Sequence, residues 1–148
     1  MRIGIAADHA GMELRDQLAH HLRGAGHQVD DLSGENDPED DYPRIVEPLA
    51  RAVAAGRYAR AIFCCGSGIG PAVAANKIAG VRAAVVENEW SARDAVEHVD
   101  VNLLTLGERV IGVEIAKACV DAFLGAEVQG GRHERRRTQI AELERGAR

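Results

Sequence analysis

Short apolar runs alternate along the chain with longer segments in which apolar residues recur at helical spacing. Several of the runs are continuously apolar, which is typical of parallel strands buried on both faces. We expect strands at residues 2–6, 28–32, 61–65, 82–87 and 102–106. Helices are expected near residues 11–24, 43–56, 70–79, 90–98 and 112–124, with a last polar helix from about residue 132. The pattern predicts an α/β fold: a five-stranded parallel sheet covered by helices on both sides.

Length and composition predict one soluble domain over residues 1–148. No apolar run approaches the ~20 residues of a membrane span, and the N-terminus lacks the long apolar stretch and cleavage site of a signal peptide. The three cysteines are an odd number in a chain of this length. Free thiols in a reducing cytoplasm are therefore expected, without a disulfide framework.

Charge is distributed unevenly along the chain. The formal net charge of -5 argues against nucleic acid as a partner, because duplex binding needs a broad positive surface. Residues 30–41 carry seven acids and no base, whereas residues 130–148 carry six arginines and three glutamates. Such a basic segment is commonly a solvated helix face; the alternative is a site for a small anion. Arg132 and Arg136 are four apart on one helix face, and with Arg109 they are candidates to bind a phosphate.

Polar residues flank the predicted strands where ligands usually bind. In parallel α/β folds that place is the carboxyl ends of the strands. Asp8 and His9 follow the first strand, Cys65 ends the third, Arg109 follows the fifth, and His98 comes just before the fifth. We expect these side chains to share one rim of the sheet. A zinc site of Asp8 with the two histidines is an alternative, but no recognised ligand spacing supports it.

A glycine-rich loop follows the third strand. Gly66, Gly68 and Gly70 alternate and lead into a helix with Pro71 at its start. Backbone N–H groups of such a loop, together with the positive helix terminus, form a cradle for a phosphate or for an oxyanion formed in a reaction. A dinucleotide site, with Glu87 as its acid, is a weaker alternative. The Gly-x-Gly-x-x-Gly motif of such sites needs glycine at its sixth position, where this chain has Pro71.

Cys65 distinguishes this loop from a plain phosphate cradle. It directly precedes the glycines and, by period-2 alternation, faces the side opposite to Cys64. A helix N-terminus lowers the pKa of a thiol, which would make Cys65 a base or a nucleophile. Cys64 and Cys119 are expected to be small buried hydrophobic residues.

Taken jointly, the motifs resemble those of the type B ribose-5-phosphate isomerases and the related galactose-6-phosphate isomerase subunits. The resemblance covers nearly the whole chain. Its motifs are ADHAG at 7–11, DYP at 41–43, CGSGIG at 65–70, AANK at 74–77, GVRA at 80–83, EH at 97–98, GERVIG at 107–112 and GGRH at 130–133. It implies a three-layer Rossmann-like fold with a C-terminal helical arm.

The resemblance implies a metal-free and cofactor-free interconversion of ribose 5-phosphate and ribulose 5-phosphate through an enediolate. By this analogy Cys65 is the base; some family members use a glutamate further along the loop, but here position 74 is alanine and no acid follows Gly70. Ser67 and the loop N–H groups would stabilise the enediolate oxygen, and Asp8 and His98 would assist ring opening. The implied substrate-binding residues are His9, Tyr42, Gly66, Gly68, Ile69, Gly70, Asn102, Arg109, Arg132 and Arg136.

The resemblance also implies a homodimer with shared active sites, with pairing into tetramers left open. Arg132 and Arg136 would then reach the partner's site from a C-terminal arm at residues 130–148. One departure concerns the substrate: family members usually carry asparagine directly after the catalytic histidine, where this chain has Val99. A tetrose 4-phosphate or a hexose 6-phosphate is therefore the alternative substrate, and a non-catalytic sugar-phosphate binding protein is the alternative function.

Overall fold

The computed structural model describes residues 1–34 and 41–146, so half of the acidic stretch at 30–41 lies outside the described residues. The sheet is five-stranded and parallel, with the strand order β2-β1-β3-β5-β4. This confirms the predicted fold class. In chain order the elements are β1 (Arg2–Ala7), α1 (Met12–Gly24), β2 (Gln28–Asp31), α2 (Tyr42–Ala54), β3 (Arg60–Cys65), α3 (Ile69–Ala75), β4 (Ala83–Val85), α4 (Glu89–Val99), β5 (Leu103–Gly107), α5 (Val113–Gly125) and α6 (Arg132–Gly146).

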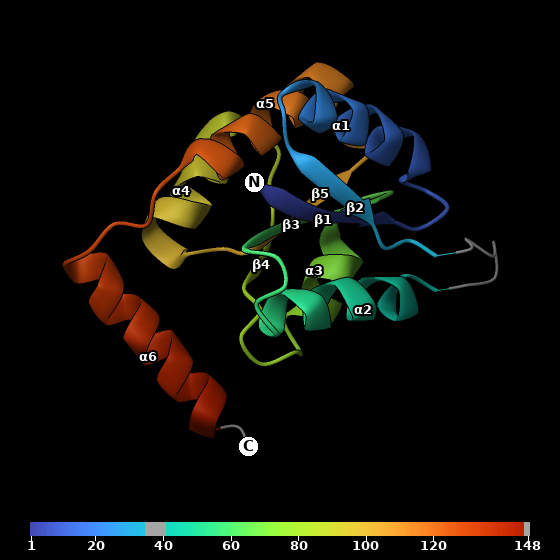
Figure 1. The fold of residues 1–148 in the computed structure, drawn as a ribbon. Coiled ribbons are helices and arrows are strands. Elements are labelled where there is room, and N and C mark those ends of the chain that lie inside the picture. The colour runs from blue at the N-terminus through green and yellow to red at the C-terminus, as the bar shows by residue number, and fades with distance from the viewer. Residues whose placement is uncertain (35–40, 147–148) are drawn as a thin grey trace.

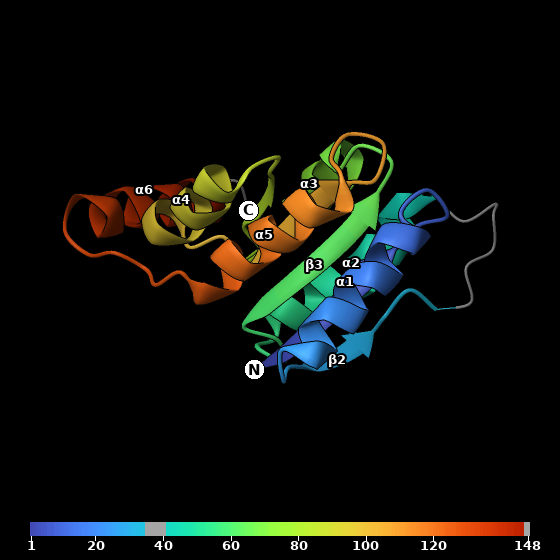
Figure 2. The ribbon, with the colours of Figure 1, turned by 90° about the horizontal axis from the view of Figure 1, so that it is seen from above.

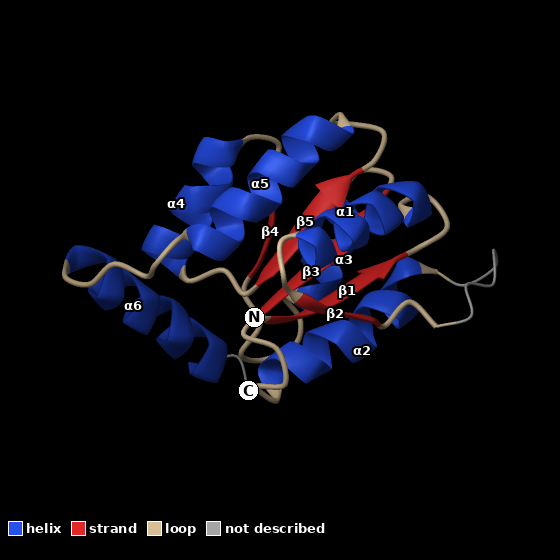
Figure 3. Ribbon diagram, turned by 45° about the horizontal axis from the view of Figure 1, so that its top comes forward, coloured by secondary structure: helices blue, strands red, loops and turns tan. Residues whose placement is uncertain are grey.

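Helices cover both faces of the sheet, so the molecule has three layers. The helices α1, α4 and α5 pack on one face, and α2 and α3 on the other (Figures 1 and 3). Side chains of β3 point alternately to the two faces: Ile62 packs against the α1, α4 and α5 side, and Phe63 packs against the α2 and α3 side. No helix in the described part of the chain is long and apolar enough to cross a bilayer.

Helix α3 and strand β4 both end earlier than the sequence predicts. Helix α3 ends at Ala75 and not near residue 79, because the Asn76 side chain bonds the backbone N–H and C=O of Ala83 at 2.8 and 2.9 Å. These bonds turn the chain directly toward β4. Arg82 does not belong to the strand, and its backbone N–H donates to the Asn102 side-chain oxygen at 2.8 Å.

The last helix, α6, forms an arm beside the three layers (Figures 1 and 2). It packs against α4, and Arg137 donates from Nη1 to the backbone oxygen of His98 at 3.2 Å. Of its residues in the described part of the chain only His133 is buried, and Leu143 is 75% exposed. The arm therefore has little contact with the hydrophobic core of its own chain.

Gly11 is expected to be essential for stability, because it brings the start of α1 against the end of β3. A Cβ at this position would lie 2.3 Å from the carbonyl carbon and oxygen of Cys64. We predict that Gly11→Ala lowers the free energy of unfolding by about 1–3 kcal/mol, measured by urea titration. Gly24→Ala is the matched control, because nothing lies within 4 Å of a Cβ there. A Gly11→Ala protein as stable as this control would contradict the prediction.

Candidate active site

A pocket of about 390 Å³ lies at the carboxyl ends of β1, β3 and β5. It lies where the strand order reverses: β2 is on one side of β1 and β3 is on the other. This is the usual ligand position in parallel α/β sheets. The pocket brings together most of the predicted site residues. It is lined by Asp8, His9, Ala10, Tyr42, Cys65, Gly66, Ser67, Gly70, Pro71, Arg109 and Val110.

The glycine-rich loop folds tightly around the Cys65 sulfur. Gly68 has a φ of 81°, a left-handed conformation that favours glycine, and its N–H donates to Cys65 Sγ at 2.9 Å. Ser67 Oγ accepts from the N–H of Ile69 at 3.3 Å. Gly70 lets the Tyr42 ring approach, since a Cβ there would lie 2.4 Å from Tyr42 Cζ. The loop thus directs N–H groups at the thiol and leaves room for an aromatic wall.

The environment of Cys65 favours the neutral thiol in the free protein. The residue is only 4% exposed, and this burial raises its pKa, although the Gly68 N–H opposes the shift. The expected lowering of its pKa by the helix start is therefore wrong in direction, because desolvation outweighs the N–H donors. Cys64 and Cys119 are fully buried, as expected, and burial raises the pKa of Cys119 to about 11.

The ends of β1 and β5 place an acid and a cation beside the thiol. Asp8 is buried, and its Oδ1 accepts the Ala10 N–H at 2.9 Å. Arg109 is held by a backbone bond from its N–H to the Gly66 oxygen at 3.1 Å. Its Nη1 lies 3.3 Å from the point where a Cβ of Gly66 would be, so glycine permits this approach. Among residues 1–34 and 41–146 no carboxylate pairs with Arg109, and its guanidinium can receive an anion.

Glu108, next to Arg109, was not predicted from the sequence as a site residue. Its carboxylate accepts the N–H of Leu14 at 2.9 Å, at the start of α1, and its own N–H donates to the Cys65 oxygen at 2.8 Å. It therefore ties α1, β3 and β5 together under the pocket. Its position after a strand in the GERVIG motif was the available signal.

His98 does not lie on the rim that holds Cys65, and this expectation is wrong. It is near the end of α4, and two residues later Asp100 contacts Arg60, the first residue of β3, at 3.4 Å. Cys65 is at the other end of that strand, five residue steps or roughly 17 Å away at ~3.3 Å per residue. Figure 2 shows α4 and α6 together to one side, away from the tip of β3. The physical reason is that a helix leading into a parallel strand ends beside the start of that strand.

His98 instead belongs to a second cluster of polar side chains, between α4 and α6. Its ring stacks on that of His133, with centroids 3.8 Å apart and planes 6° apart. Arg132 donates from Nε to His133 Nε2 at 3.3 Å, and Arg136 is exposed one turn along α6. Three predicted site residues therefore lie together but away from the pocket: His98, expected to assist ring opening, and Arg132 and Arg136, expected to bind the phosphate.

Asn102 has a different position from the one expected of a substrate-binding residue. Its Oδ1 accepts the Arg82 N–H at 2.8 Å and its Nδ2 donates to the Gly80 oxygen at 2.9 Å. Both ends of the amide thus hold the backbone that leads into β4. Val99 packs against the hydrophobic core. Neither side chain is free to replace the carboxamide that the family pattern has after His98.

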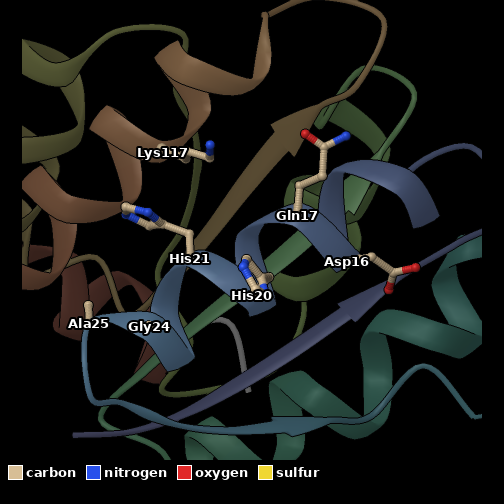
Figure 4. Close-up of a pocket in the computed structure, with 7 residues that line it drawn as sticks. All are labelled: Asp16, Gln17, His20, His21, Gly24, Ala25 and Lys117. Carbon is tan, nitrogen blue, oxygen red and sulfur yellow. The ribbon is translucent and has the colours of Figure 1, made fainter.

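A second, open groove of about 670 Å³ lies between α1 and α5 (Figure 4). Its charged side chains already have partners, since His21 Nε2 is 2.8 Å from Asp121 Oδ1 and Lys117 Nζ is 2.8 Å from Glu114 Oε1. None of the predicted site residues lines it. Within the described ranges, no three His, Cys, Asp or Glu side chains are grouped so as to hold a metal ion.

Comparison with known proteins agrees with this geometry. A family model described as Ribose/Galactose Isomerase matches residues 3–140. The chain is 41% identical to "Ribose-5-phosphate isomerase B" of Escherichia coli K12, covering 97% of this chain and 96% of that one. It is 38% identical to "D-erythrulose-4-phosphate isomerase" of Pectobacterium atrosepticum, covering 88% and 87%.

A solved structure gives the same result. Ribose-5-phosphate isomerase B of Mycoplasma genitalium, with bound ribulose-5-phosphate, aligns with a TM-score of 0.90 at 36% identity, over 97% of this chain and 96% of that one. The family model and the relative from E. coli each cover nearly all of the chain. The protein thus belongs to the ribose/galactose isomerase family and is a sugar-phosphate isomerase.

Proposed function

We propose that the protein interconverts ribose 5-phosphate and ribulose 5-phosphate through an enediolate, with Cys65 as the base. The observation that carries the proposal is the Cys65 sulfur, held 2.9 Å from the Gly68 nitrogen in a pocket with Asp8 and Arg109. The relative from E. coli that is named for this substrate, and the homologous structure that holds ribulose 5-phosphate, support it. Membership of an isomerase family disfavours a non-catalytic binding protein.

The proposed reaction transfers one proton between neighbouring carbons. The Cys65 thiolate takes the proton from C2 of the open-chain aldose, and the negative charge of the enediolate goes to O1. The thiol then gives its proton to C1, the O2 hydroxyl proton moves to O1, and the C2=O2 double bond of the ketose forms. N–H groups of the 66–70 loop and the Ser67 hydroxyl stabilise the charge on O1, at about 3 kcal/mol for a well-placed donor. Asp8 and His98 transfer the protons that open the furanose ring. His9 and Arg109 bind the phosphate.

The proposed enzyme is a homodimer in which each active site takes residues from both subunits. Support comes from a separation within one chain. Cys65 is at the carboxyl end of β3, whereas the cluster of His98, Arg132 and Arg136 lies toward the other end of that strand. A second copy would bring its α4–α6 cluster to the pocket. The arm at residues 130–148 is the segment that we propose contacts the partner, since its described part has little contact with its own core.

We propose the cytoplasm as the compartment of the enzyme. The cysteines at positions 64, 65 and 119 are all free. A base built on Cys65 requires a thiol that stays reduced, and thiols persist in reducing compartments.

A four-carbon aldose phosphate is the second candidate substrate. The relative from Pectobacterium is named for erythrulose 4-phosphate, and Val99 removes a carboxamide that the family pattern provides for a sugar hydroxyl. A shorter sugar has fewer hydroxyl groups to satisfy. An unpaired buried hydroxyl costs about 1–3 kcal/mol, which is enough to shift the preference between substrates.

The first test is a comparison of catalytic efficiency on aldose phosphates of four, five and six carbons. Ketose formation is the measured quantity, and we predict the highest kcat/KM for ribose 5-phosphate. Cys65→Ala should lower this kcat/KM by about 10²- to 10⁴-fold, because a general base is removed. Cys119→Ala is the control, since Cys119 is buried away from the pocket. A higher kcat/KM for the tetrose would favour the second candidate. A Cys65→Ala protein with most of its activity would contradict the assigned base.

The pH dependence follows from the burial of Cys65. Because burial raises its pKa, the thiolate forms at higher pH than in an exposed cysteine. We predict that the rate of Cys65 alkylation by iodoacetamide rises with pH, with a midpoint above that of the same cysteine in the urea-unfolded chain. Mass spectrometry of the modified peptide measures this rate, and the buried Cys64 and Cys119 serve as internal references. A midpoint below that of the unfolded chain would refute the prediction.

Subunit mixing tests the shared site. Cys65→Ala and Arg136→Ala subunits are each expected to be inactive as homodimers. In a mixed dimer one site loses both residues and the other keeps both, so we predict that mixing restores ketose formation. Native mass spectrometry confirms that hybrids form. Hybrids without activity would show that each site is built from a single chain.

A further inference from the structure

Asp94 contacts the imidazole of His98 from the same helix. It lies one turn earlier on α4, and its Oδ1 is 2.5 Å from His98 Nδ1. The two side chains are about equally exposed, at 31% for Asp94 and 34% for His98. The i,i+4 spacing makes this contact a consequence of helix geometry. Asp94 is outside the motifs that carry the family resemblance.

His133 restricts the tilt of the His98 ring by stacking on it. The two rings are stacked with nearly parallel planes, and His133 is buried. Burial, helped by the positive charges around it, lowers the pKa of His133, so this ring stays neutral. Because Arg132 donates to His133 Nε2, its Nδ1 carries the hydrogen, and in the described part of the chain that atom has no partner. The ring is thus held by packing and forms a flat, neutral support for His98.

The two contacts together leave one ring atom of His98 for chemistry. Nδ1 lies against the Asp94 carboxylate as an ion pair when the imidazole is protonated, and Nε2 takes part in no ion pair among the described residues. A carboxylate beside Nδ1 favours the tautomer in which Nδ1 carries the hydrogen, and it orients the ring. Such a ring is prepared to hold a proton on Nε2 and to release it to a substrate.

We propose that Asp94 is a positioning residue for ring opening, acting through His98; this inference rests on the proposed function. In that step the Asp8 carboxylate takes the proton from the O1 hydroxyl, and the His98 imidazolium gives its Nε2 proton to the ring oxygen O4. The C1–O4 bond breaks and the C1=O1 double bond forms. Asp94 holds the charged donor before the transfer and keeps the neutral ring in the same orientation after it.

Two reactions of the same enzyme separate this step from the enediolate chemistry. Ribose 5-phosphate is a furanose and must be opened. Ribulose 5-phosphate carries its phosphate on the oxygen that would close the ring, so it is acyclic. Exchange of its C1 hydrogen with deuterium from D2O therefore proceeds without ring opening, and NMR measures its rate.

We expect Asp94→Asn to lower kcat/KM for ribose 5-phosphate about tenfold, the size of the loss of one contact with a charged group, and to leave the C1 exchange unchanged. Asp94→Glu should recover part of the loss. In a His98→Ala background, Asp94→Asn should have no further effect, because it acts through that ring. Circular dichroism checks that each variant is folded.

The chain contains a matched control. Asp121 also pairs a carboxylate with an imidazole, here Nε2 of His21 at 2.8 Å, beside the groove between α1 and α5 where Figure 4 shows His21. Asp121→Asn should change neither reaction. Equal losses of both reactions in Asp94→Asn, or no loss, would overturn the inference. A wild-type protein that catalyses neither reaction would overturn the proposed function itself, and the inference with it.

Discussion

Close backbone packing at the carboxyl ends of β1, β3 and β5 is the constraint on which the pocket depends. Gly11 lies against the backbone of Cys64, and Gly107 lies against that of Ser67, where an added Cβ would be 2.7 Å away. These contacts leave no space for a side chain. They bring three strand ends within reach of one another, and the pocket residues follow directly from those ends. A larger residue at either glycine would separate the acid, the thiol and the guanidinium.

The same packing determines the chemistry of Cys65. A thiol held among tightly packed strand ends is dehydrated, and its neutral form is favoured. The N–H of Gly68 opposes this effect without reversing it. As the proposed base, Cys65 would gain basicity from burial, since a thiolate with a raised pKa is a stronger proton acceptor once formed. In the proposed reaction, the small fraction of Cys65 that is thiolate is offset by the strength of that thiolate as a base.

The α4–α6 cluster shows how a fold can prepare residues at a distance from their proposed site. Stacking on His133 and the contact with Asp94 orient His98 within its own chain. The proposed partner subunit would then receive an ordered imidazole beside two arginines. Ordering these side chains before association reduces the entropy lost when the shared site forms. In the proposed dimer, the buried His133 at the start of the exposed arm would serve to order His98.

The sequence by itself determined the order and type of every element and most of the pocket. Apolar periodicity located the five strands to within a few residues, and the rule for strand ends placed Asp8, His9, Cys65 and Arg109 together. Local patterns sufficed there because burial on both faces of a parallel sheet leaves a plain signal. Only the tertiary structure decided that His98 lies at the opposite end of the sheet, that Asn102 holds backbone, and that the pKa of Cys65 is raised. These properties depend on which segments meet in space and exclude water, and no local spacing along the chain records that.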